Sequence, residues 1–362
     1  MIPAFLGIEN PKKMPYAEMW LGTHKGAPSK AVFDEKTVSL AEITGELPFL
    51  LKLLGVKNPL SIQVHPNKRQ AAEGFALEEK TGFDIRSPQR CYKDPNHKPE
   101  IICALSPFTL MAGFRGFPDI IKNLEEFAKL LPQLKEIVSP LCSALKSGLL
   151  AAFFRILFNL SDFEREYIGS LILQIDPGSK QEADRVISKE QWNLMKQFAF
   201  MYPKDPAIIS PLYLNLITLM PGQAVYIPAG VLHAYISGFG VELMASSDNV
   251  LRGGLTPKYV DIPKLSSILS YNPYIPNVLS PDSSSCFFYN TPGEEFQLVY
   301  INGGEMVFPG KGPAVCIVTE GELLADGIKF KKGESFLIPA DAQSAALKGS
   351  YSLFAAITAD KS

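Results

Sequence analysis

The sequence offers little sulfur chemistry. It contains five cysteines in 362 residues, and no two of them form a Cys-x-x-Cys pair. An odd number of scattered cysteines is typical of free thiols in a reducing compartment. The pattern excludes a disulfide framework and a zinc site made of thiolates, and we expect a cytoplasmic protein. The cysteines are Cys91, Cys103, Cys142, Cys286 and Cys316.

Long apolar runs and surplus positive charge are also missing. Residues 1–5 form neither a basic leader nor a long apolar run, so we expect no secretory signal. The most apolar segment, residues 148–160, is short and carries Arg155, which favours a buried helix over a membrane span. A net charge of −2 provides no basic face for nucleic acid or an anionic membrane. Any anion-binding site must therefore be local.

Composition and hydrophobic spacing predict a mainly β chain with an all-α insertion. Apolar residues make up 46% of the sequence, as in globular proteins with a large core. Short apolar runs between Pro and Gly predict antiparallel strands up to about residue 117. They are residues 49–53, 60–64, 101–105 and 109–114.

Helical spacing begins at about residue 119 and continues to about residue 201. Apolar residues recur there every three or four positions, as an amphipathic helix requires. Ser161 and Glu164 have the spacing of a capping box, which predicts a helix start. We expect the helices to be broken near Pro132, Pro140 and Pro177.

One sequence pattern occurs twice. Gly222 to His233 reads Gly-Gln-Ala-Val-Tyr-Ile-Pro-Ala-Gly-Val-Leu-His, and Gly333 to Ser344 reads Gly-Glu-Ser-Phe-Leu-Ile-Pro-Ala-Asp-Ala-Gln-Ser. Each copy predicts a turn at glycine, a short strand, a corner at Pro-Ala and one inward side chain. His233 can bind a metal, whereas Ser344 cannot. The duplication predicts two β-barrels with a single active centre.

These signals divide the chain into three parts. Strand character resumes at Leu212 and runs to Val241, a linker rich in Pro, Ser and Asn covers 273–282, and short alternating strands fill 296–357. The predicted division is a catalytic barrel (1–117 and 210–264), a helical insertion (118–209) and a C-terminal barrel (265–362).

The four histidines, at positions 24, 65, 97 and 233, are the first candidates for catalysis. Ser61, Gln63 and His65 occupy alternate positions of one strand and therefore face the same side, which we expect to be the barrel interior. A half-exposed polar strand face would give the same pattern. His233 on its own would be a satisfied core histidine.

A metal-binding set follows when these segments are combined. Either His97 or Glu100 could be a ligand, but their three-residue separation points them to opposite faces. Glu100 heads a buried strand, and an unpaired buried carboxylate is costly, so it needs a cation. Together with Gln63, His65 and His233 it forms an N/O site that suits zinc or another borderline divalent metal.

The segment from Asp248 to Lys258 carries two cations beside paired glycines. A solvated loop with ordinary surface charges is the simpler explanation. The functional interpretation is a flexible loop that brings Arg252 and Lys258 over an anionic substrate.

Five motifs in order resemble type I phosphomannose isomerase, and the likeness covers almost the whole chain. They are Tyr16-Ala-Glu-Met-Trp-Leu-Gly-Thr-His24, Gln63-Val-His65-Pro, His97-Lys-Pro-Glu100, Tyr226-Ile-Pro-Ala-Gly-x-x-His233-Ala-Tyr235 and Asn249-x-x-Arg252-Gly-Gly-Leu-Thr-Pro-Lys258. The resemblance implies cupin-type antiparallel β-barrels (jelly rolls), the first catalytic and the second degenerate. Family members usually open with a strand containing a Tyr-Asp-Trp-Gly-like sequence, and this chain begins after it, so we expect the difference to affect the sheet edge more than the active site.

The resemblance also implies an activity and site roles. The activity is a zinc-dependent interconversion of mannose 6-phosphate and fructose 6-phosphate through a cis-enediol, by a monomer with one Zn²⁺ per chain. The implied zinc ligands are Gln63, His65, Glu100 and His233. Arg252 and Lys258 are the implied catalytic residues, and we expect Ser61, Lys98, Glu18 and Tyr235 to bind the phosphosugar.

Some questions stay open at this point. A metal-bound water, Lys258 or Lys98 could move the carbon-bound proton. A non-haem iron oxygenase would favour two histidines and one carboxylate, so a glutamine ligand argues against it. A sugar-phosphate sensor on an inactive scaffold is the non-enzyme alternative, and intact Arg252 with a complete ligand set argues against that.

Overall fold

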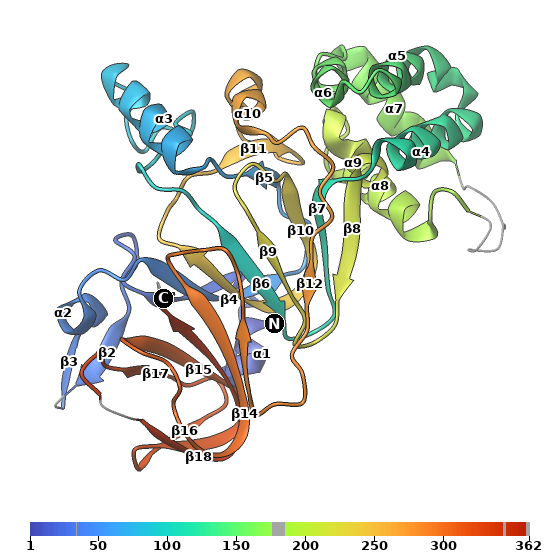
Figure 1. Cartoon of the computed structure of the whole chain (residues 1–362). Coiled ribbons are helices and arrows are strands. Elements are labelled where there is room, and N and C mark those ends of the chain that lie inside the picture. Colours follow the sequence, from blue (N-terminus) through green and yellow to red (C-terminus); the bar gives the residue numbers. More distant parts are fainter. Residues whose placement is uncertain (34, 176–184, 343–344, 360–362) are drawn as a thin grey trace.

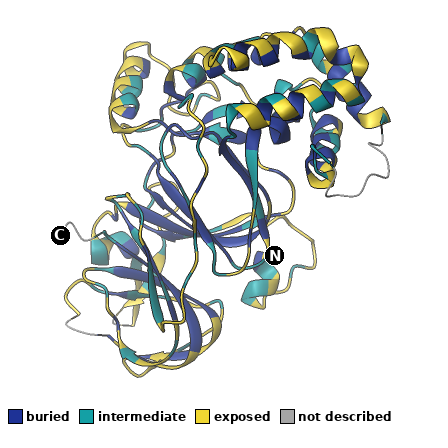
Figure 2. Cartoon of the chain, turned by 45° about the vertical axis from the view of Figure 1, so that its right-hand side comes forward, coloured by how far each residue is buried: buried dark blue, intermediate teal, exposed yellow. Residues whose placement is uncertain are grey.

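The computed structural model describes residues 1–33, 35–175, 185–342 and 345–359. A β unit occupies the middle of the molecule, with a group of helices at one end and a second β unit at the other (Figure 1). Buried residues line the facing sides of the sheets, whereas the outer faces of the helices are exposed (Figure 2). Within the described residues no helix has the length and apolarity needed to cross a membrane.

The first β unit is organised around its longest strand, β10. Residues 233–237 of β10 pair with β5 and β7, and residues 238–245 pair with β4 and β6. The register shifts just before Gly238, whose φ of 135° and close approach to Phe108 leave no room for a side chain. The strands are β1 (Glu18–Gly22), β4 (Phe49–Val56), β5 (Ile62–Val64), β6 (Glu100–Ala104), β7 (Phe108–Phe114), β8 (Leu214–Leu219), β9 (Ala224–Ile227), β10 (His233–Ala245), β11 (Leu251–Gly254) and β12 (Val278–Leu279).

The shared strand β10 creates an interior between two strand groups. One group has the order β11-β5-β10-β7-β8 and the other β1-β4-β10-β6-β9-β12. Leu54, Ile102 and Phe108 fill the interior, together with the ring of Tyr235. Because β10 belongs to both groups, side chains from its two halves meet in this interior. The edge strands of the second group are β1 and β12, which pair with β4 and β9 respectively.

The predicted helical insertion lies between β7 and β8. Its elements are α4 (Phe117–Leu130), η1 (Pro132–Leu134), α5 (Lys135–Lys146), α6 (Leu150–Phe158), α7 (Asp162–Gln174), α8 (Lys189–Met201), η3 (Pro206–Ile209) and α9 (Ser210–Tyr213). The capping box of Ser161 and Glu164 is present at the start of α7, as predicted. The prediction of a break at Pro140 is wrong, because α5 continues through it. Buried Val138, Leu141 and Leu145 pack this helix strongly enough to offset the lost hydrogen bond.

Two further sequence expectations fall near the insertion. Pro177 lies outside the described residues. Leu212 belongs to α9 rather than to a strand, and β8 starts at Leu214. Pro211 in the first turn of α9 favours that helical turn, because its ring fixes a helical φ where no N–H is needed.

The second β unit contains six strands. They are β13 (Cys286–Tyr289), β14 (Gln297–Val307), β15 (Ala314–Ala325), β16 (Ile328–Lys331), β17 (Ser335–Ile338) and β18 (Ala346–Ile357). Three of them have 11 or 12 residues and are longer than the short strands predicted. The predicted linker 273–282 also contains β12, which pairs with β9. The two β units share a hydrophobic core in which Leu51 and Leu243 meet Leu298 and Phe354.

The duplicated pattern is visible in the backbone. Gly222 and Gly333 have φ values of 85° and 88°, as a glycine turn requires. The strands that follow, β9 and β17, begin at the same distance from these glycines. Ser344 lies outside the described residues. That the second copy lacks a metal-binding side chain at the position of His233 therefore stays a prediction from sequence.

The remaining elements surround the two β units. None of them was predicted from the sequence. α10 lies next to β11, and α3 is linked to α10 by the ion pair between Glu78 and Lys264 at 2.6 Å (Figure 1). The elements are α1 (Ile2–Leu6), β2 (Lys30–Phe33), β3 (Lys36–Ser39), α2 (Leu40–Thr44), α3 (Lys68–Lys80) and α10 (Ile262–Ile268).

Candidate active site

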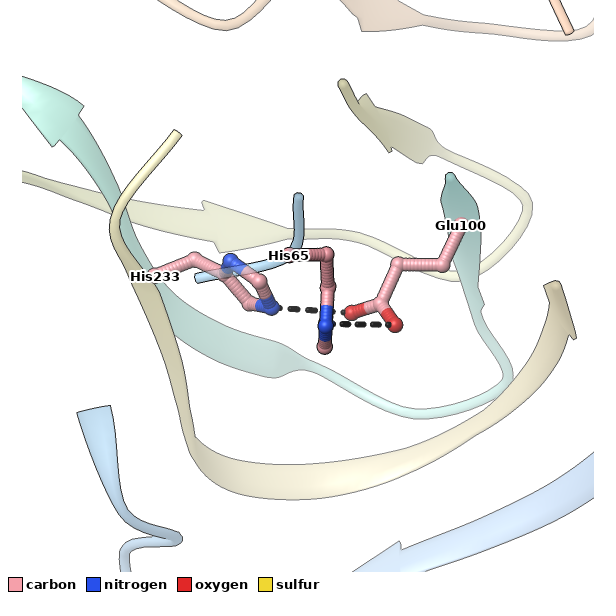
Figure 3. A group of neighbouring side chains, drawn as sticks. All are labelled: His65, Glu100 and His233. Carbon is pink, nitrogen blue, oxygen red and sulfur yellow. Dashed lines mark ion pairs between the residues drawn. The ribbon is translucent and has the colours of Figure 1, made fainter. Parts of the chain in front are cut away.

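Two imidazoles and one carboxylate meet inside the first β unit. His65 follows β5, Glu100 begins β6 and His233 begins β10, and all three are buried. The Nε2 atom of His233 lies 3.0 Å from Oε1 of Glu100, and Nε2 of His65 lies 3.4 Å from Oε2 (Figure 3). They are brought together because β10 pairs with both β5 and β6. In the part of the chain described, this is the one cluster of His, Cys, Asp or Glu with metal-binding spacing.

Backbone carbonyls fix the tautomer of both imidazoles. Nδ1 of His65 lies 2.7 Å from the carbonyl of Asn249, and Nδ1 of His233 lies 2.9 Å from that of Val231. Because a carbonyl only accepts hydrogen bonds, each Nδ1 carries the proton and each Nε2 turns a lone pair toward Glu100. This is the usual arrangement of metal-binding histidines.

The electrostatics of the cluster fit a bound cation. Burial and the nearby Lys98 ammonium lower the pKa of His65 to about 4, so its imidazole is neutral. Burial alone would raise the pKa of Glu100, but the Lys98 ammonium beside it holds this pKa well below its ordinary value. The buried Nε2 of His65 has no hydrogen-bond partner. Two lone pairs and an ionised carboxylate therefore face one another, which a divalent metal would satisfy.

Gln63 completes the predicted metal-binding set. Its side-chain amide nitrogen lies 3.3 Å from Nε2 of His233. The oxygen and nitrogen of an amide exchange places on a flip, so the oxygen can face the cluster equally well. The other two histidines lie elsewhere: His97 pairs with Glu295 at 2.7 Å, and His24 pairs with Asp248 at 3.2 Å.

A cavity of about 440 Å³ adjoins the cluster. This volume is within the usual range of roughly 300–1,000 Å³ for small-molecule sites. Seven of the predicted site residues line it: Glu18, Ser61, Gln63, Lys98, Tyr235, Arg252 and Lys258. A larger cavity of about 600 Å³ between β2, β3 and the second β unit is lined mostly by apolar side chains. The smaller cavity is therefore the candidate substrate site.

Two lining residues connect the cavity to the metal cluster. The Lys98 ammonium lies 2.9 Å from Oε2 of Glu100, and the Tyr235 hydroxyl donates to Oε1 at 2.8 Å. Burial raises the pKa of Tyr235 well above its ordinary value, so its hydroxyl keeps the proton that it donates. Both side chains therefore orient the carboxylate that a metal would use.

The structure also reveals a buried ion pair that the sequence reasoning missed. Lys52, Trp20 and Glu242 are cross-strand neighbours on β4, β1 and β10, and all three line the cavity. Nζ of Lys52 lies 3.0 Å from Glu242 and 3.5 Å from Glu18. Burial acts against the charge, but these carboxylates outweigh it and raise the pKa of Lys52. A lysine inside the apolar run Phe-Leu-Leu-Lys-Leu-Leu was the available signal, because a buried charge needs a partner.

Asn249, which opens the fifth motif but was given no role from the sequence, joins two loops beside the metal cluster. Its buried amide donates to the carbonyls of Asp94 and Asn96, both at 2.7 Å, and accepts from the amide of Lys93 at 2.6 Å. Its own carbonyl accepts from His65. The loop before β6 and the acceptor of His65 are thereby held as one unit.

The chain is similar to proteins of one family in both sequence and structure. Residues 2–117 match the model of the phosphomannose isomerase type I catalytic domain. The mannose-6-phosphate isomerase of Escherichia coli (strain K12) is 33% identical over 95% of this chain and 91% of that protein. The human enzyme of the same name is 37% identical over 72% of this chain and 64% of its own length.

Two solved structures extend the comparison to nearly the whole fold. A zinc-bound mannose 6-phosphate isomerase matches with a TM-score of 0.87 and 32% identity, covering 99% of this chain and 95% of that one. The Salmonella typhimurium enzyme, bound to fructose 6-phosphate and zinc, matches with a TM-score of 0.86 and 32% identity over 99% of this chain and 94% of that one. The chain therefore belongs to the type I phosphomannose isomerase family.

Proposed function

We propose that the protein is a zinc-dependent aldose–ketose isomerase that interconverts D-mannose 6-phosphate and D-fructose 6-phosphate through a cis-enediol. The observation that carries this function is the buried cluster of His65, Glu100 and His233 beside a cavity lined by Arg252 and Lys258. Relatives at 33–38% identity are mannose-6-phosphate isomerases, and one related structure holds both fructose 6-phosphate and zinc.

Gln63, His65, Glu100 and His233 would hold one zinc ion per chain. When bound, zinc supplies a Lewis acid that polarises the substrate oxygens next to the reacting carbons. The protein's contribution is to present two fixed Nε2 lone pairs and one ionised carboxylate. Lys98 and Tyr235 keep that carboxylate in place through their contacts with Glu100.

Arg252 and Lys258 supply positive charge from one side of the cavity. Arg252 lies opposite Gln63 in the pairing of β11 with β5, next to the metal-binding set. Its guanidinium stays protonated and would stabilise the negative charge that develops on the enediolate oxygens. Lys258, at the exposed end of the same loop, would attract and bind the anionic substrate or assist in the proton transfer.

The proton that moves between C1 and C2 needs a base beside the reacting carbons. Lys98 donates to Glu100 at 2.9 Å and Lys52 pairs with Glu242 at 3.0 Å, so each nitrogen is already held by a buried carboxylate. Glu242 lines the cavity as a carboxylate and is held by Lys52 at 3.0 Å. We propose Glu242 as the base, with Lys52 orienting it and balancing its charge, and the two other candidates are Lys258 and a metal-bound water.

The remaining candidates would bind the sugar phosphate. Ser61 offers a hydroxyl two residues before Gln63, and Glu18 offers a carboxylate to the sugar hydroxyls. Lys98 and Tyr235 line the same cavity, so each would contact the substrate as well as Glu100. Lys98 also supplies positive charge for the phosphate.

At the level of the fold, we propose that both β units are cupin-type barrels, the first catalytic and the second degenerate. In this proposal residues 1–117 and 210–264 form the catalytic barrel, residues 118–209 form the helical insertion, and residues 265–362 form the degenerate barrel. We further propose that the enzyme acts as a monomer without nucleic acid or membrane partners. The free cysteines support a reducing compartment such as the cytoplasm.

A coupled assay for fructose 6-phosphate formed from mannose 6-phosphate tests the function directly. We expect turnover that is lost after dialysis against a chelator and restored by zinc. Free mannose is the control substrate and should react far less efficiently. A protein with stoichiometric zinc that does not convert mannose 6-phosphate would contradict the proposal.

A further inference from the structure

The loop that carries Arg252 and Lys258 has an unfavourable backbone conformation at its centre. Leu255 is buried and has a φ of 52°, in the left-handed region that non-glycine residues rarely adopt. Gly254 before it has a φ of 124°. Such a conformation persists only where neighbouring groups impose it, and it is often found at functional sites.

The neighbouring group is Asp205, at the end of the helical insertion. Its carboxylate caps η3 by accepting from the amide of Ala207 at 2.9 Å. The same carboxylate accepts from the amide of Thr256 at 3.4 Å, and it also interacts with the amide of Leu255. Two successive amides around a left-handed residue form a small concave anion site, and here a side chain of the protein fills it.

The contact between the insertion and the loop is close. A Cβ atom placed on Gly254 would lie 2.4 Å from Cβ of Ala207 and 2.8 Å from Oδ1 of Asp205. Only a glycine therefore allows the loop backbone to reach the carboxylate. Burial raises the pKa of Asp205 despite the amides that it accepts from, which is consistent with a carboxylate shielded from water at this contact.

Asp205 is also linked to Lys258, at the exposed end of the loop, through Thr256. Oγ1 of Thr256, the residue whose amide reaches Asp205, accepts from the amide of Lys258 at 3.1 Å. Thr256 also lines the substrate cavity, as does Tyr202 from the insertion. The hydrogen bonds that the Asp205 carboxylate accepts come from Ala207 and Thr256, neither of which belongs to the metal-binding set.

We propose that Asp205 is a positioning residue for the isomerase: its carboxylate holds Leu255 and Thr256 so that Arg252 and Lys258 face the substrate. This inference rests on the proposed function. It assigns the helical insertion a part in substrate binding that sequence motifs do not indicate, because Asp205 lies outside every motif around the metal.

The test compares Asp205→Ala with Asp205→Asn, which keeps the shape and one acceptor oxygen. A loop displaced by about 1 Å costs on the order of 10²-fold in rate, so we expect kcat/KM of Asp205→Ala to fall about 10²-fold. Asp205→Asn should retain more activity than Asp205→Ala. Zinc content should stay at the wild-type value for both. Glu166→Gln, an exposed change in the insertion at the ion pair with Lys204, is the matched control and should leave kinetics unchanged.

A double-mutant cycle separates positioning from general stability. If Asp205 acts through the loop, Asp205→Ala should cost less in the Lys258→Ala background than in the wild type, because the part of its effect that passes through Lys258 is already lost. Additive losses, or wild-type kcat/KM in both Asp205 variants, would overturn the inference. If Asp205→Ala does not fold, the cycle with Asp205→Asn decides. An inactive wild-type enzyme would instead refute the proposed function, so the two failures are distinguishable.

Discussion

The carbonyl of Asn249 lies 2.7 Å from Nδ1 of His65, and the side chain of Asn249 is itself fixed by the backbone around Asp94. The imidazole of His65 is therefore oriented by a buried residue far away in sequence. This relationship matters because a histidine binds metal well only when its second nitrogen is held in the donor form. Asn249 would thus support the proposed metal site without being a ligand.

Asn249→Ala should weaken zinc binding without removing a ligand. The carbonyl of residue 249 would remain but would lose the side-chain bonds that hold its loop against residues 93–96. Changes in such supporting groups typically cost about 10–100-fold in metal affinity. Competition against a chromophoric chelator measures the loss. Asn290→Ala, on the exposed surface of the second β unit, is the control, and equal zinc affinity in both variants would refute the role.

Glu242→Gln tests the proposed base. The substitution preserves shape but removes the ability to accept a proton, and general base catalysis is worth about 10²–10⁴-fold. We expect kcat to fall by that amount with zinc content unchanged, because Glu242 does not belong to the metal-binding set. Glu320→Gln, in an exposed position of β15, is the control. If Glu242→Gln keeps the wild-type kcat, Glu242 is not the base, and Lys258 becomes the first candidate.

Replacing Arg252 should mainly lower kcat, whereas replacing Lys98 should mainly raise KM. Arg252→Ala should lower kcat by about 10²–10³-fold if the guanidinium stabilises charge that appears only in the transition state. Lys98→Ala should raise KM strongly, because its charge would serve the phosphate. It should also lower zinc affinity, since Lys98 lies 2.9 Å from Glu100. Steady-state kinetics at saturating zinc isolate the first effect, and an unchanged kcat in Arg252→Ala would contradict its role.

Much of the site could be predicted because its chemistry depends on residue types that are rare or costly in a buried strand. The sequence has four histidines, so the three in strand-edge segments rich in polar groups stood out, and two of these, His65 and His233, meet in the cluster. Glu100 was identifiable because a buried carboxylate requires a cation. The alternation of Gln63 and His65 followed from strand geometry alone. Arg252 and Lys258 stood out as two cations beside paired glycines, and the resemblance to the family then gave them catalytic roles.

The missed residues depend on pairings that no local pattern shows. Lys52 and Glu242 become partners only through the register between β4 and β10. Asn249 and Asp205 act through backbone atoms, and amide or carboxylate side chains in loops usually have only local roles. The helix through Pro140 shows the same limit in the fold, because buried contacts outweighed a local rule. The sequence analysis did not predict these features because each depends on tertiary contacts between segments far apart in the chain.

The second β unit should bind no catalytic metal, and the protein should carry one zinc per chain. No histidine follows His233 in the sequence, and the described residues of the second β unit contain no cluster with metal-binding spacing. Its contribution is the apolar core shared with the first unit, to which Phe354 and Leu298 belong. Metal analysis of the wild type should give a ratio of one, and His233→Ala should lose that zinc, because removing one imidazole leaves the cluster with a single nitrogen ligand. A Phe354→Ala variant should be destabilised by roughly 3–5 kcal/mol while keeping its zinc when folded, since it loses a large buried side chain. A second zinc per chain in the wild type would show that the second unit binds metal after all.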